Sequence, residues 1–360
     1  MAYRNIFRQT KRTILTLVTI IFGIFLGILG DGLNSGMKWQ LADTYIKTMT
    51  STVKLYKSGY FNPDEIKTQI EYGFNDSKEL DEVLSTIQEI TAYSKRFAFD
   101  GKITNGADEL NAQYIGIDPD EENRVFDRKK MIISGEYLND LNSEKAVLGK
   151  DLAESLGLKK GDIVTISARS KNRTMNAYDV EVAGIIRTGN PLIDMNAVFI
   201  PLGLAQKLGD APEINDIAIL LKTKDMKTIK TILPEIKNSV SKQGLEVIPW
   251  YEETKDLLSL VAFREKIFGI ITAVILIMAA AGITNTMLMA MLERKREIGI
   301  MMANGMEKKE ILTLFITEGA VLGVIGSGIA LISGYLLVSY FQKYGIAIPV
   351  PIEASDSVSD

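Results

Sequence analysis

The chain offers few side chains for acid–base, nucleophilic or metal chemistry. It contains neither histidine nor cysteine. Serine–histidine and cysteine–histidine nucleophiles are therefore excluded, and the commonest transition-metal ligand is missing. No segment has the G-x-x-x-x-G-K-[ST] spacing of a phosphate-binding P-loop. An ordinary hydrolase is disfavoured, and if ATP drives this protein, the ATPase is a separate subunit. We predict no catalytic, metal-binding or cofactor-binding residue in the chain.

One acidic cluster could in principle bind a cation. Asp118, Asp120, Glu121 and Glu122 supply the oxygen ligands that calcium prefers. Their spacing is not that of a known calcium loop, and Pro119 suits a turn. We therefore interpret the cluster as a solvated turn.

The most informative charged segment is the loop at 293–309, which joins two long apolar runs. Residues 297–303 could form about two helical turns with Ile298, Met301 and Met302 on one side. Asn304 and Gly305 then offer a left-handed helix stop. Because apolar residues on an exposed loop require cover, we predict that another subunit contacts this short amphipathic helix.

The elements that position this loop are predicted membrane spans. Each of three apolar runs is long enough to cross the ~30 Å hydrocarbon core as a helix. They cover residues 13–32, 267–292 and 311–340. Lys and Arg resist translocation, so we expect the amino terminus and the 293–309 loop in the cytoplasm, with residues 33–264 and 341–360 outside.

The first span is preceded by a basic segment at residues 1–12, which we predict to be an interfacial helix with Tyr3, Ile6 and Phe7 at headgroup level. A cleaved signal peptide also begins with basic residues followed by an apolar run. The apolar run here is longer than a usual signal core, and residues 30–32 make a poor cleavage site, which favours an uncleaved span.

Small residues recur within the spans. Gly23 and Gly27 are four residues apart, as are Gly319 and Gly323, and this spacing lets helix backbones approach closely in lipid. Glycine is also simply common in membrane helices, so the pattern favours helix packing without assigning partners. Glu318 is the only ionisable residue inside its span, and we assign it a structural role near the cytoplasmic interface.

Residues 33–264 are predicted to form an α+β domain between the first two spans, with helical stalks at 39–48 and 252–266. Strands are predicted from β-branched and alternating runs at 52–56, 97–103, 113–117, 146–148, 162–168, 180–186, 197–200, 216–221 and 245–249. Helices are predicted at 77–90, 150–156, 202–208 and 224–241, the last disturbed at Pro234.

The overall composition agrees with a divided chain. The 360 residues are 46% hydrophobic and 24% charged, with a net charge of −4, and the charged residues concentrate between the apolar ends. No strong basic excess exists, so nucleic acid is not an expected partner, whereas membrane lipid is.

The loop and its flanking spans resemble those of the FtsX-like ABC transporter permeases, which include lipoprotein-releasing and macrolide-exporting (MacB-type) permeases. The match is strongest at 285–305, where an Asn-Thr-Met stretch ends the second span and Glu-Ile-Gly opens the loop helix. It continues through 311–323, and residues 2–6 with 11–13 are similar to the family's entry helix.

Weaker matches in the outer domain are most similar to the lipoprotein-releasing branch. They lie at 54–60, 116–119 with Glu121 and Glu122, 134–138, 147–156, 160–162, and at Thr188, Gly189 and Asp194. Together with the loop motif, the resemblance covers nearly the whole chain.

The resemblance implies a mechanism and partners. In this family two ATPase subunits bind ATP and Mg, close, and push on coupling helices, and the second span carries the motion to the outer domain. In the lipoprotein-releasing branch, lipoproteins are lifted from the outer leaflet of the inner membrane and passed to a periplasmic carrier. The resemblance implies a second permease copy or paralogue and an ATPase contact at Glu297, Ile298, Gly299, Ala303 and Gly305.

Two other functions remain open. Macrolide- or peptide-exporting permeases share the mechanics but commonly carry the ATPase on the same chain, and no ATPase motif is present here. A division-type relative would signal to a cell-wall hydrolase, usually with an outer domain much smaller than the ~230 residues predicted here. Family members have a fourth span, so we expect a sequence that stops at Asp360 to be a piece of a longer chain.

Overall fold

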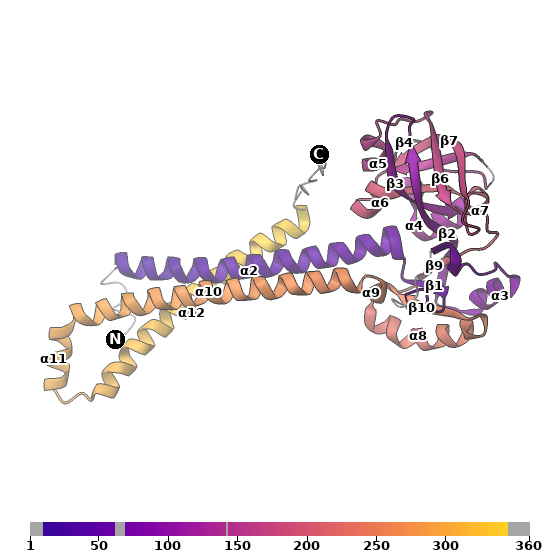
Figure 1. The fold of residues 1–360 in the computed structure, drawn as a ribbon. Coiled ribbons are helices and arrows are strands. Elements are labelled where there is room, and N and C mark those ends of the chain that lie inside the picture. Colours follow the sequence, from indigo (N-terminus) through magenta and orange to yellow (C-terminus); the bar gives the residue numbers. More distant parts are fainter. Residues whose placement is uncertain (1–9, 62–68, 142, 345–360) are drawn as a thin grey trace. The chain divides into compact units, whose positions relative to one another are not determined.

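The computed structural model describes residues 10–61, 69–141 and 143–344 (Figure 1). The chain divides into two compact units, one formed by Met1–Trp39 with Ser259–Asp360 and the other by Gln40–Leu258. Most of the predicted interfacial helix at 1–12 and of the predicted outer segment at 341–360 lies outside the described residues.

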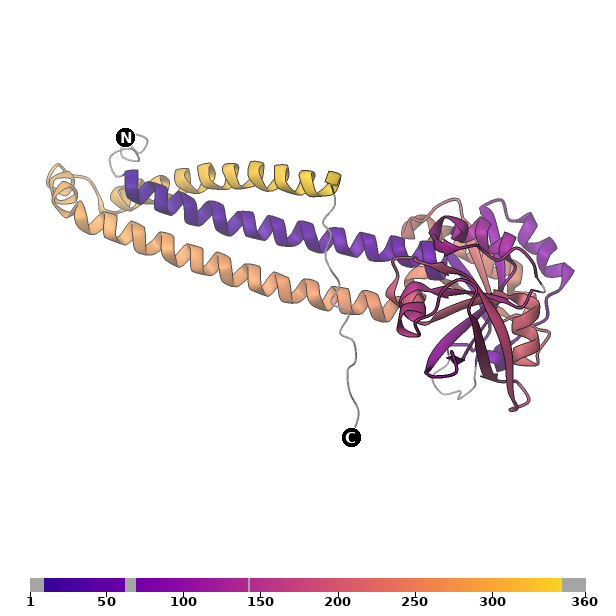
Figure 2. The ribbon, with the colours of Figure 1, turned by 90° about the horizontal axis from the view of Figure 1, so that it is seen from above.

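Three long helices and one short helix dominate the first unit. The long ones are α2 (Thr10–Tyr45), α10 (Lys255–Glu293) and α12 (Lys308–Tyr344), and α11 (Lys295–Ala303) lies between the last two in sequence. Each long helix is long and apolar enough to cross a membrane, and the three predicted spans lie within them. In the first unit α2 and α10 run side by side, and α12 crosses them obliquely (Figure 1) and contacts both (Figure 2).

Glycines line the contact between α2 and α10. A Cβ atom added to Gly23 would lie 3.6 Å from Ala279 Cβ, and one added to Gly27 would lie 3.3 Å from Thr272 Cγ2. Both predicted glycines of the first span therefore face the second span, Gly23 with room for a Cβ atom and Gly27 at a closer approach than most Cβ contacts.

The glycines of α12 differ from one another. A Cβ atom on Gly319 would lie 3.6 Å from Met287 Cε of α10, whereas one on Gly323 would meet nothing within 4 Å. The tightest approach is at Gly326, whose added Cβ would lie 2.7 Å from Ile20 Cγ2 of α2. Gly326 thus lets α12 approach α2 closely, which the i, i+4 spacing alone did not single out.

The second unit contains ten strands with helices between them. The strands are β1 (Val53–Lys57), β2 (Ile90–Thr104), β3 (Glu109–Ile117), β4 (Ile132–Gly135), β5 (Lys145–Gly149), β6 (Ile163–Arg169), β7 (Met175–Ile186), β8 (Ala197–Pro201), β9 (Asp216–Leu221) and β10 (Leu245–Pro249). The helices are α3 (Lys78–Thr86), α4 (Pro119–Phe126), α5 (Lys150–Ser155), α6 (Pro191–Asn196), α7 (Leu202–Gly209), α8 (Met226–Val240) and α9 (Trp250–Glu253). Short non-α segments are the π-helix η2 (Ile46–Thr50) and the 3-10 helices η3 (Gln69–Tyr72), η4 (Arg128–Met131) and η5 (Ser241–Gln243).

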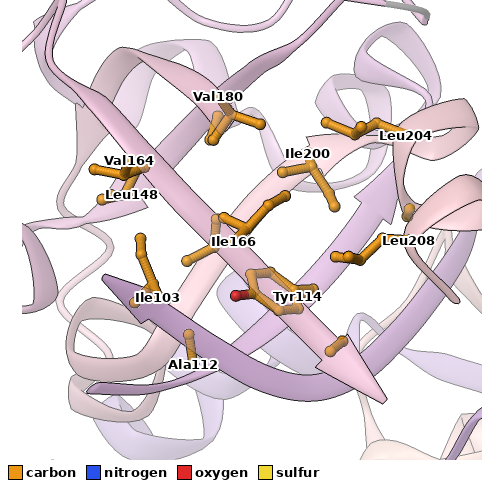
Figure 3. Close-up of a cluster of buried hydrophobic side chains, with 14 of the residues drawn as sticks. Ile103, Ala112, Tyr114, Leu148, Val164, Ile166, Val180, Ile200, Leu204 and Leu208 are labelled. Carbon is orange, nitrogen blue, oxygen red and sulfur yellow. The ribbon is translucent and has the colours of Figure 1, made fainter. Parts of the chain in front are cut away.

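Six of the strands pair in a closed ring. The pairs run β2–β3, β3–β8, β8–β5, β5–β7, β7–β6 and back from β6 to β2. Inward-pointing side chains of all six strands fill the ring, and Leu204 and Leu208 of α7 complete the core (Figure 3). Closure leaves these strands without exposed edges along the paired segments.

The remaining order, β10–β1–β9–β2, extends the sheet away from the ring. One face of this extension buries aliphatic residues such as Leu55 and Ile219 against α3 and α8, giving a second core. Alternation along each strand sends the other side chains to the opposite face, where Ala218 and Leu220 form a small apolar cluster with residues of α4. The same face carries the buried charges described below.

Most of the predicted outer-domain elements are present, with three differences. The predicted helix at 77–90 ends at Thr86, because Ile90 begins β2. Pro234 lies inside α8 without ending it. β4, α4 and α6 were not predicted.

Candidate functional site

The loop helix α11 occupies the predicted position between the second and third spans. It begins after Arg294 and ends at Ala303, where Gly305 adopts a φ of +94° that favours glycine. Gly305 N–H donates to Met302 O at 3.0 Å, closing the end of the helix. The predicted helix and its glycine stop are confirmed.

The apolar side chains of α11 differ in exposure. Ile298 and Met301 are half-buried, whereas Ile300 and Met302 are 56% and 43% exposed. Met302 lies four residues after Ile298 and therefore on the same side of the helix, as the sequence suggested, but its side chain is more exposed. The helix therefore exposes apolar surface, which is the property expected of a helix that another subunit covers.

The five predicted contact residues lie along this helix and its stop. Glu297, Gly299, Ala303 and Gly305 are exposed, and Ile298 is half-buried. Nothing lies within 4 Å of a Cβ atom added to Gly299, so its outer side is open. Their role in binding an ATPase remains a prediction.

Glu318 has a partner within the same unit. Arg294 Nη1 lies 3.7 Å from Glu318 Oε2, and both side chains are 11% exposed. The pair joins the first residue after α10 to the third turn of α12, so the two ends of the loop are linked. This arrangement fits the structural role predicted for Glu318.

A second polar cluster lies in the Gln40–Leu258 unit, around a buried carboxylate. Arg96 donates to Glu122 through Nε at 2.9 Å and Nη2 at 2.7 Å, and Arg128 Nε donates at 3.0 Å. Ser94 Oγ donates to Glu122 Oε2 at 2.9 Å. Glu122 and Arg128 are fully buried, so two cations flank one anion away from water.

Glu122 reaches this position because α4 follows β3 directly. Asp118 caps α4 by accepting from the N–H groups of Asp120 and Glu121, and Pro119 occupies its first turn. Glu122 then points inward. The interpretation of this cluster as a solvated turn was wrong: the segment is a helix, and its fourth acidic residue pairs with arginines inside the domain.

The aspartate of β9 links this group to a second set of charges. Asp216 lies opposite Arg96 in the β2–β9 ladder. Lys54 Nζ lies 3.1 Å from Asp216 Oδ2 and 3.0 Å from Glu253 Oε1. Tyr56 OH donates to the same Glu253 oxygen at 2.9 Å. Three cations and three anions therefore meet on one face of the sheet.

The pKa values of these groups follow from burial and pairing. Burial raises the pKa of Glu122, but the guanidinium groups of Arg96 and Arg128 outweigh it and hold that pKa below its usual range. Burial lowers the pKa of Lys54, but Asp216 and Glu253 outweigh it and raise the pKa above its usual value. Both groups are therefore charged at neutral pH.

The network also holds the segments where the chain enters and leaves the domain. Arg128 Nη2 donates to Thr48 O at 2.6 Å and Arg96 Nη1 donates to Met49 O at 3.1 Å, so two guanidinium groups bind the end of η2, which continues α2. Glu253 belongs to α9, just before α10. The charges thus connect the sheet to the outer ends of two long helices.

A cavity of about 300 Å³ lies against this network. Its walls come from η2, β1, η3, β2, β3, η4, α6, β9 and α9, and include Arg128, Asp216 and Glu253. Sequence reasoning missed this site because its residues are scattered over some 200 positions and only the acidic run at 118–122 stood out.

Comparison with known proteins assigns the family. The model of the MacB-like periplasmic core domain matches residues 13–239, and that of the FtsX-like permease C-terminal region matches residues 269–358. The chain belongs to the FtsX-like ABC transporter permeases that carry a MacB-like periplasmic core domain. It is therefore a membrane protein with an extracellular α+β domain.

Three relatives illustrate the range of the family. An uncharacterized ABC transporter permease of Methanocaldococcus jannaschii is 24% identical over 95% of this chain and 83% of its own length. The lipoprotein-releasing system transmembrane protein LolC of Neisseria meningitidis is 23% identical over 65% of this chain and 58% of its own length. The macrolide export ATP-binding/permease protein MacB of Marinobacter nauticus is 24% identical over 96% of this chain and 54% of its own length.

Proposed function

We propose that this permease couples ATP hydrolysis by a separate dimer of ATPase subunits to movement of the extracellular domain, and that its cargo is lipoproteins in the outer leaflet of the inner membrane. ATP and Mg would bind in the ATPase, and this chain would supply no catalytic group. A second permease, either a copy or a paralogue, would complete the transporter.

The observation that carries the ATPase contact is the outward side of α11. Ile300, Met302 and Gly299 present an open, partly apolar surface between two spans. Burying such surface against a partner is favourable at roughly 25 cal/mol per Å² of apolar area. The salt bridge between Arg294 and Glu318 would keep the helix in place when it is pushed.

The second span is suited to transmit a displacement. α10 is one helix of 39 residues from Lys255 to Glu293, which is about 58 Å at 1.5 Å per residue. Its outer end follows α9, whose Glu253 is bonded to Lys54 and Tyr56 of β1. A push at Glu293 would therefore act on the sheet of the extracellular domain through a few charged contacts.

One observation favours lipoproteins as cargo: the sequence matches to the lipoprotein-releasing branch are spread over the outer domain, where LolC is among the relatives. Macrolide efflux is the second candidate, because the alignment to MacB covers 96% of this chain, against 65% for LolC. Release of lipoproteins into a soluble carrier fraction by ATP-supplied membranes would support the first, whereas drug hypersensitivity of a deletion strain without any release defect would support the second.

The ATPase contact is tested with reconstituted complex. Gly299→Arg and Glu297→Lys should abolish cargo-stimulated ATP hydrolysis while membrane insertion stays normal. Gly299→Ala should keep the activity, because a Cβ atom there meets nothing within 4 Å. Glu235→Lys on the exposed side of α8 makes the same charge change as Glu297→Lys outside the loop. Unchanged stimulation in the Gly299→Arg and Glu297→Lys complexes would refute the contact.

A further inference from the structure

The chain enters the extracellular domain through an unusual junction. α2 ends at Tyr45, and the next five residues form the π-helix η2 (Ile46–Thr50). Ser51 and Thr52 then connect η2 to β1, which begins at Val53. Short π-helical segments are rare and occur frequently at functional sites. This junction is therefore a candidate for a role of its own.

The backbone of Ser51 is strained. Its φ of 55° and ψ of −156° lie at the edge of a region that is essentially confined to glycine. Asp127 and Asp210 also have positive φ, but their ψ values of 39° and 47° place them in the left-handed helical region, which aspartate tolerates. A residue keeps a strained conformation only where the surrounding structure holds it there. Contacts around Ser51 must therefore offset the strain.

Strand β9 supplies one set of these contacts. Ser51 Oγ donates to Ile219 O at 2.9 Å, and Thr52 N–H donates to the same oxygen at 3.1 Å. Thr52 Oγ1 in turn accepts from Leu221 N–H at 2.9 Å. Both Ser51 and Thr52 are buried, so water does not compete for these bonds. β9 thus fixes the two residues that follow η2.

Three donors from other elements bind η2 itself. Arg128 of η4 donates to Thr48 O at 2.6 Å. Arg96 of β2 donates to Met49 O at 3.1 Å. Asn190, which precedes α6, donates through Nδ2 to Thr48 Oγ1 at 3.0 Å. We call these three donors the η2 clamp; because they are distant from η2 in the sequence, the conformation of the junction depends on the tertiary structure.

The residues of the η2 clamp are themselves held in place. Glu122 binds both Arg96 and Arg128. Asn190 Oδ1 accepts from Leu192 N–H at 3.1 Å as the N-cap of α6. Side chains that are already ordered lose little further entropy when they bind another group. The η2 clamp is therefore rigid.

We propose that η2 and Ser51 form a locked joint, in which the η2 clamp maintains a strained backbone and makes the outer end of α2 move with the sheet of the domain. When the clamp is weakened, Ser51 leaves its strained conformation and the end of α2 pivots relative to the sheet. The lock is a property of the extracellular domain alone. Its use in passing motion from α2 to the sheet rests on the proposed function.

Apolar anchoring is the alternative explanation for how this end of α2 is held. Ile46 is buried in the second core, and Ala42 packs against that core. Apolar contacts are non-directional, so they do not account for a strained torsion at Ser51. If they alone oriented α2, loss of one hydroxyl at the junction would lower stability and leave the orientation of α2 unchanged.

The test is the distance distribution between two spin labels in the full chain in detergent, measured by double electron–electron resonance. Gln40→Cys on α2 and Asn111→Cys on β3 provide two exposed sites in the Gln40–Leu258 unit. The chain has no cysteine of its own, so the labels attach only there. With the joint intact, we expect one narrow distribution.

Thr48→Val removes the hydroxyl that Asn190 binds and keeps the β-branched shape. It should increase the population outside the main distance about fivefold or more, because a buried hydrogen bond is lost and Asn190 is left unpaired. Thr165→Val on β6 is the matched control, since it removes a hydroxyl that donates to Asp179 at 2.6 Å outside the joint. It should leave the distribution unchanged. The same distribution in Thr48→Val as in the unmodified joint, or equal broadening in Thr165→Val, would overturn the lock.

A pair of variants at Ser51 measures the strain. Ser51→Ala and Ser51→Gly both remove the hydroxyl, but only glycine adopts this backbone conformation without strain. Thermal unfolding of the Ser51→Gly chain should therefore have a midpoint roughly 2 °C or more above that of Ser51→Ala. A midpoint for Ser51→Gly at or below that of Ser51→Ala would contradict the proposal. This pair also decides it if Thr48→Val fails to fold.

The locked joint and the proposed function fail separately. The distance measurement requires neither ATP nor the ATPase, so it tests the lock alone. ATPase stimulation that persists in Gly299→Arg and Glu297→Lys would refute the ATPase contact, whereas an unchanged distribution in Thr48→Val would refute the lock.

Discussion

Two regions of this protein are rich in arginine and glutamate, and they use these residues in opposite ways. In the extracellular domain, Arg96, Glu122 and Arg128 are buried and bonded to one another. In the loop between α10 and α12, Glu297 and its basic neighbours are exposed, as is the apolar Ile300. The charged groups of the first region are paired within the domain, and those of the second are exposed, where we propose that a partner binds.

The buried charges affect the free energy of folding, whereas the exposed groups affect the free energy of association. Two buried cations without Glu122 would be far more costly than any surface pair, so the network contributes to folding of the domain. Exposed charges and two exposed apolar side chains contribute little to folding but can contribute to association. Substitutions in the buried network should therefore change the stability of the domain. Substitutions in α11 should change assembly with a partner.

The largest effect is expected for Glu122→Gln. Removing the anion while Arg96 and Arg128 stay buried should lower the free energy of unfolding of the domain by about 3–5 kcal/mol. Denaturant unfolding of the full chain, followed by fluorescence of buried Trp250 in a Trp39→Phe background, measures it.

Glu109→Gln is the matched control for this substitution. Glu109 pairs with Lys102 at 2.5 Å, but both side chains are about half exposed, so the cost should be roughly 0–1 kcal/mol. Equal losses in the free energy of unfolding for Glu122→Gln and Glu109→Gln would mean that the buried network stabilises the domain no more than a surface ion pair does.

A smaller effect is expected where α12 meets α2. Gly326→Leu should destabilise the membrane helices by about 1–3 kcal/mol, because its Cβ would already lie 2.7 Å from Ile20. Gly323→Leu, three residues earlier, should cost little, since that side of α12 is open. Thermal denaturation in detergent compares them. A larger loss at Gly323 would show that this glycine packs against a second permease instead.

The smallest effect on stability is expected in α11, together with the clearest loss of assembly. Ile300→Asp should change the free energy of unfolding by no more than about 0.5 kcal/mol, because Ile300 is 56% exposed. Co-purification with the ATPase should nevertheless be lost.

Ile133→Asp is the control for this substitution, since Ile133 on β4 is similarly exposed at 53%. It should leave co-purification intact. Recovery of equal amounts of ATPase with Ile300→Asp and with the unmodified chain would place the contact elsewhere.

Local pattern predicted the elements with strong periodicity. The three long helices, the loop helix with its Gly305 stop, and nine of the ten strands follow from runs of apolar, β-branched or turn-forming residues. Short elements were missed because four to eight residues carry little periodicity, as in β4 and α6. α4 did carry a signal, since Asp118 and Pro119 form a helix cap and first turn.

The sequence by itself determined the membrane plan, the two-unit division and the absence of histidine- and cysteine-based chemistry, because hydropathy and composition are properties of the chain alone. Only the tertiary structure decided that Glu122 is buried between two arginines and that Arg128, Asp216 and Glu253 share one cavity. Those residues are brought together by strand pairing and by the packing of α4, η4 and α9. A local run of residues does not specify which distant strands pair or in which register. The sequence alone therefore does not distinguish an exposed carboxylate in an acidic stretch from one that is buried in a network.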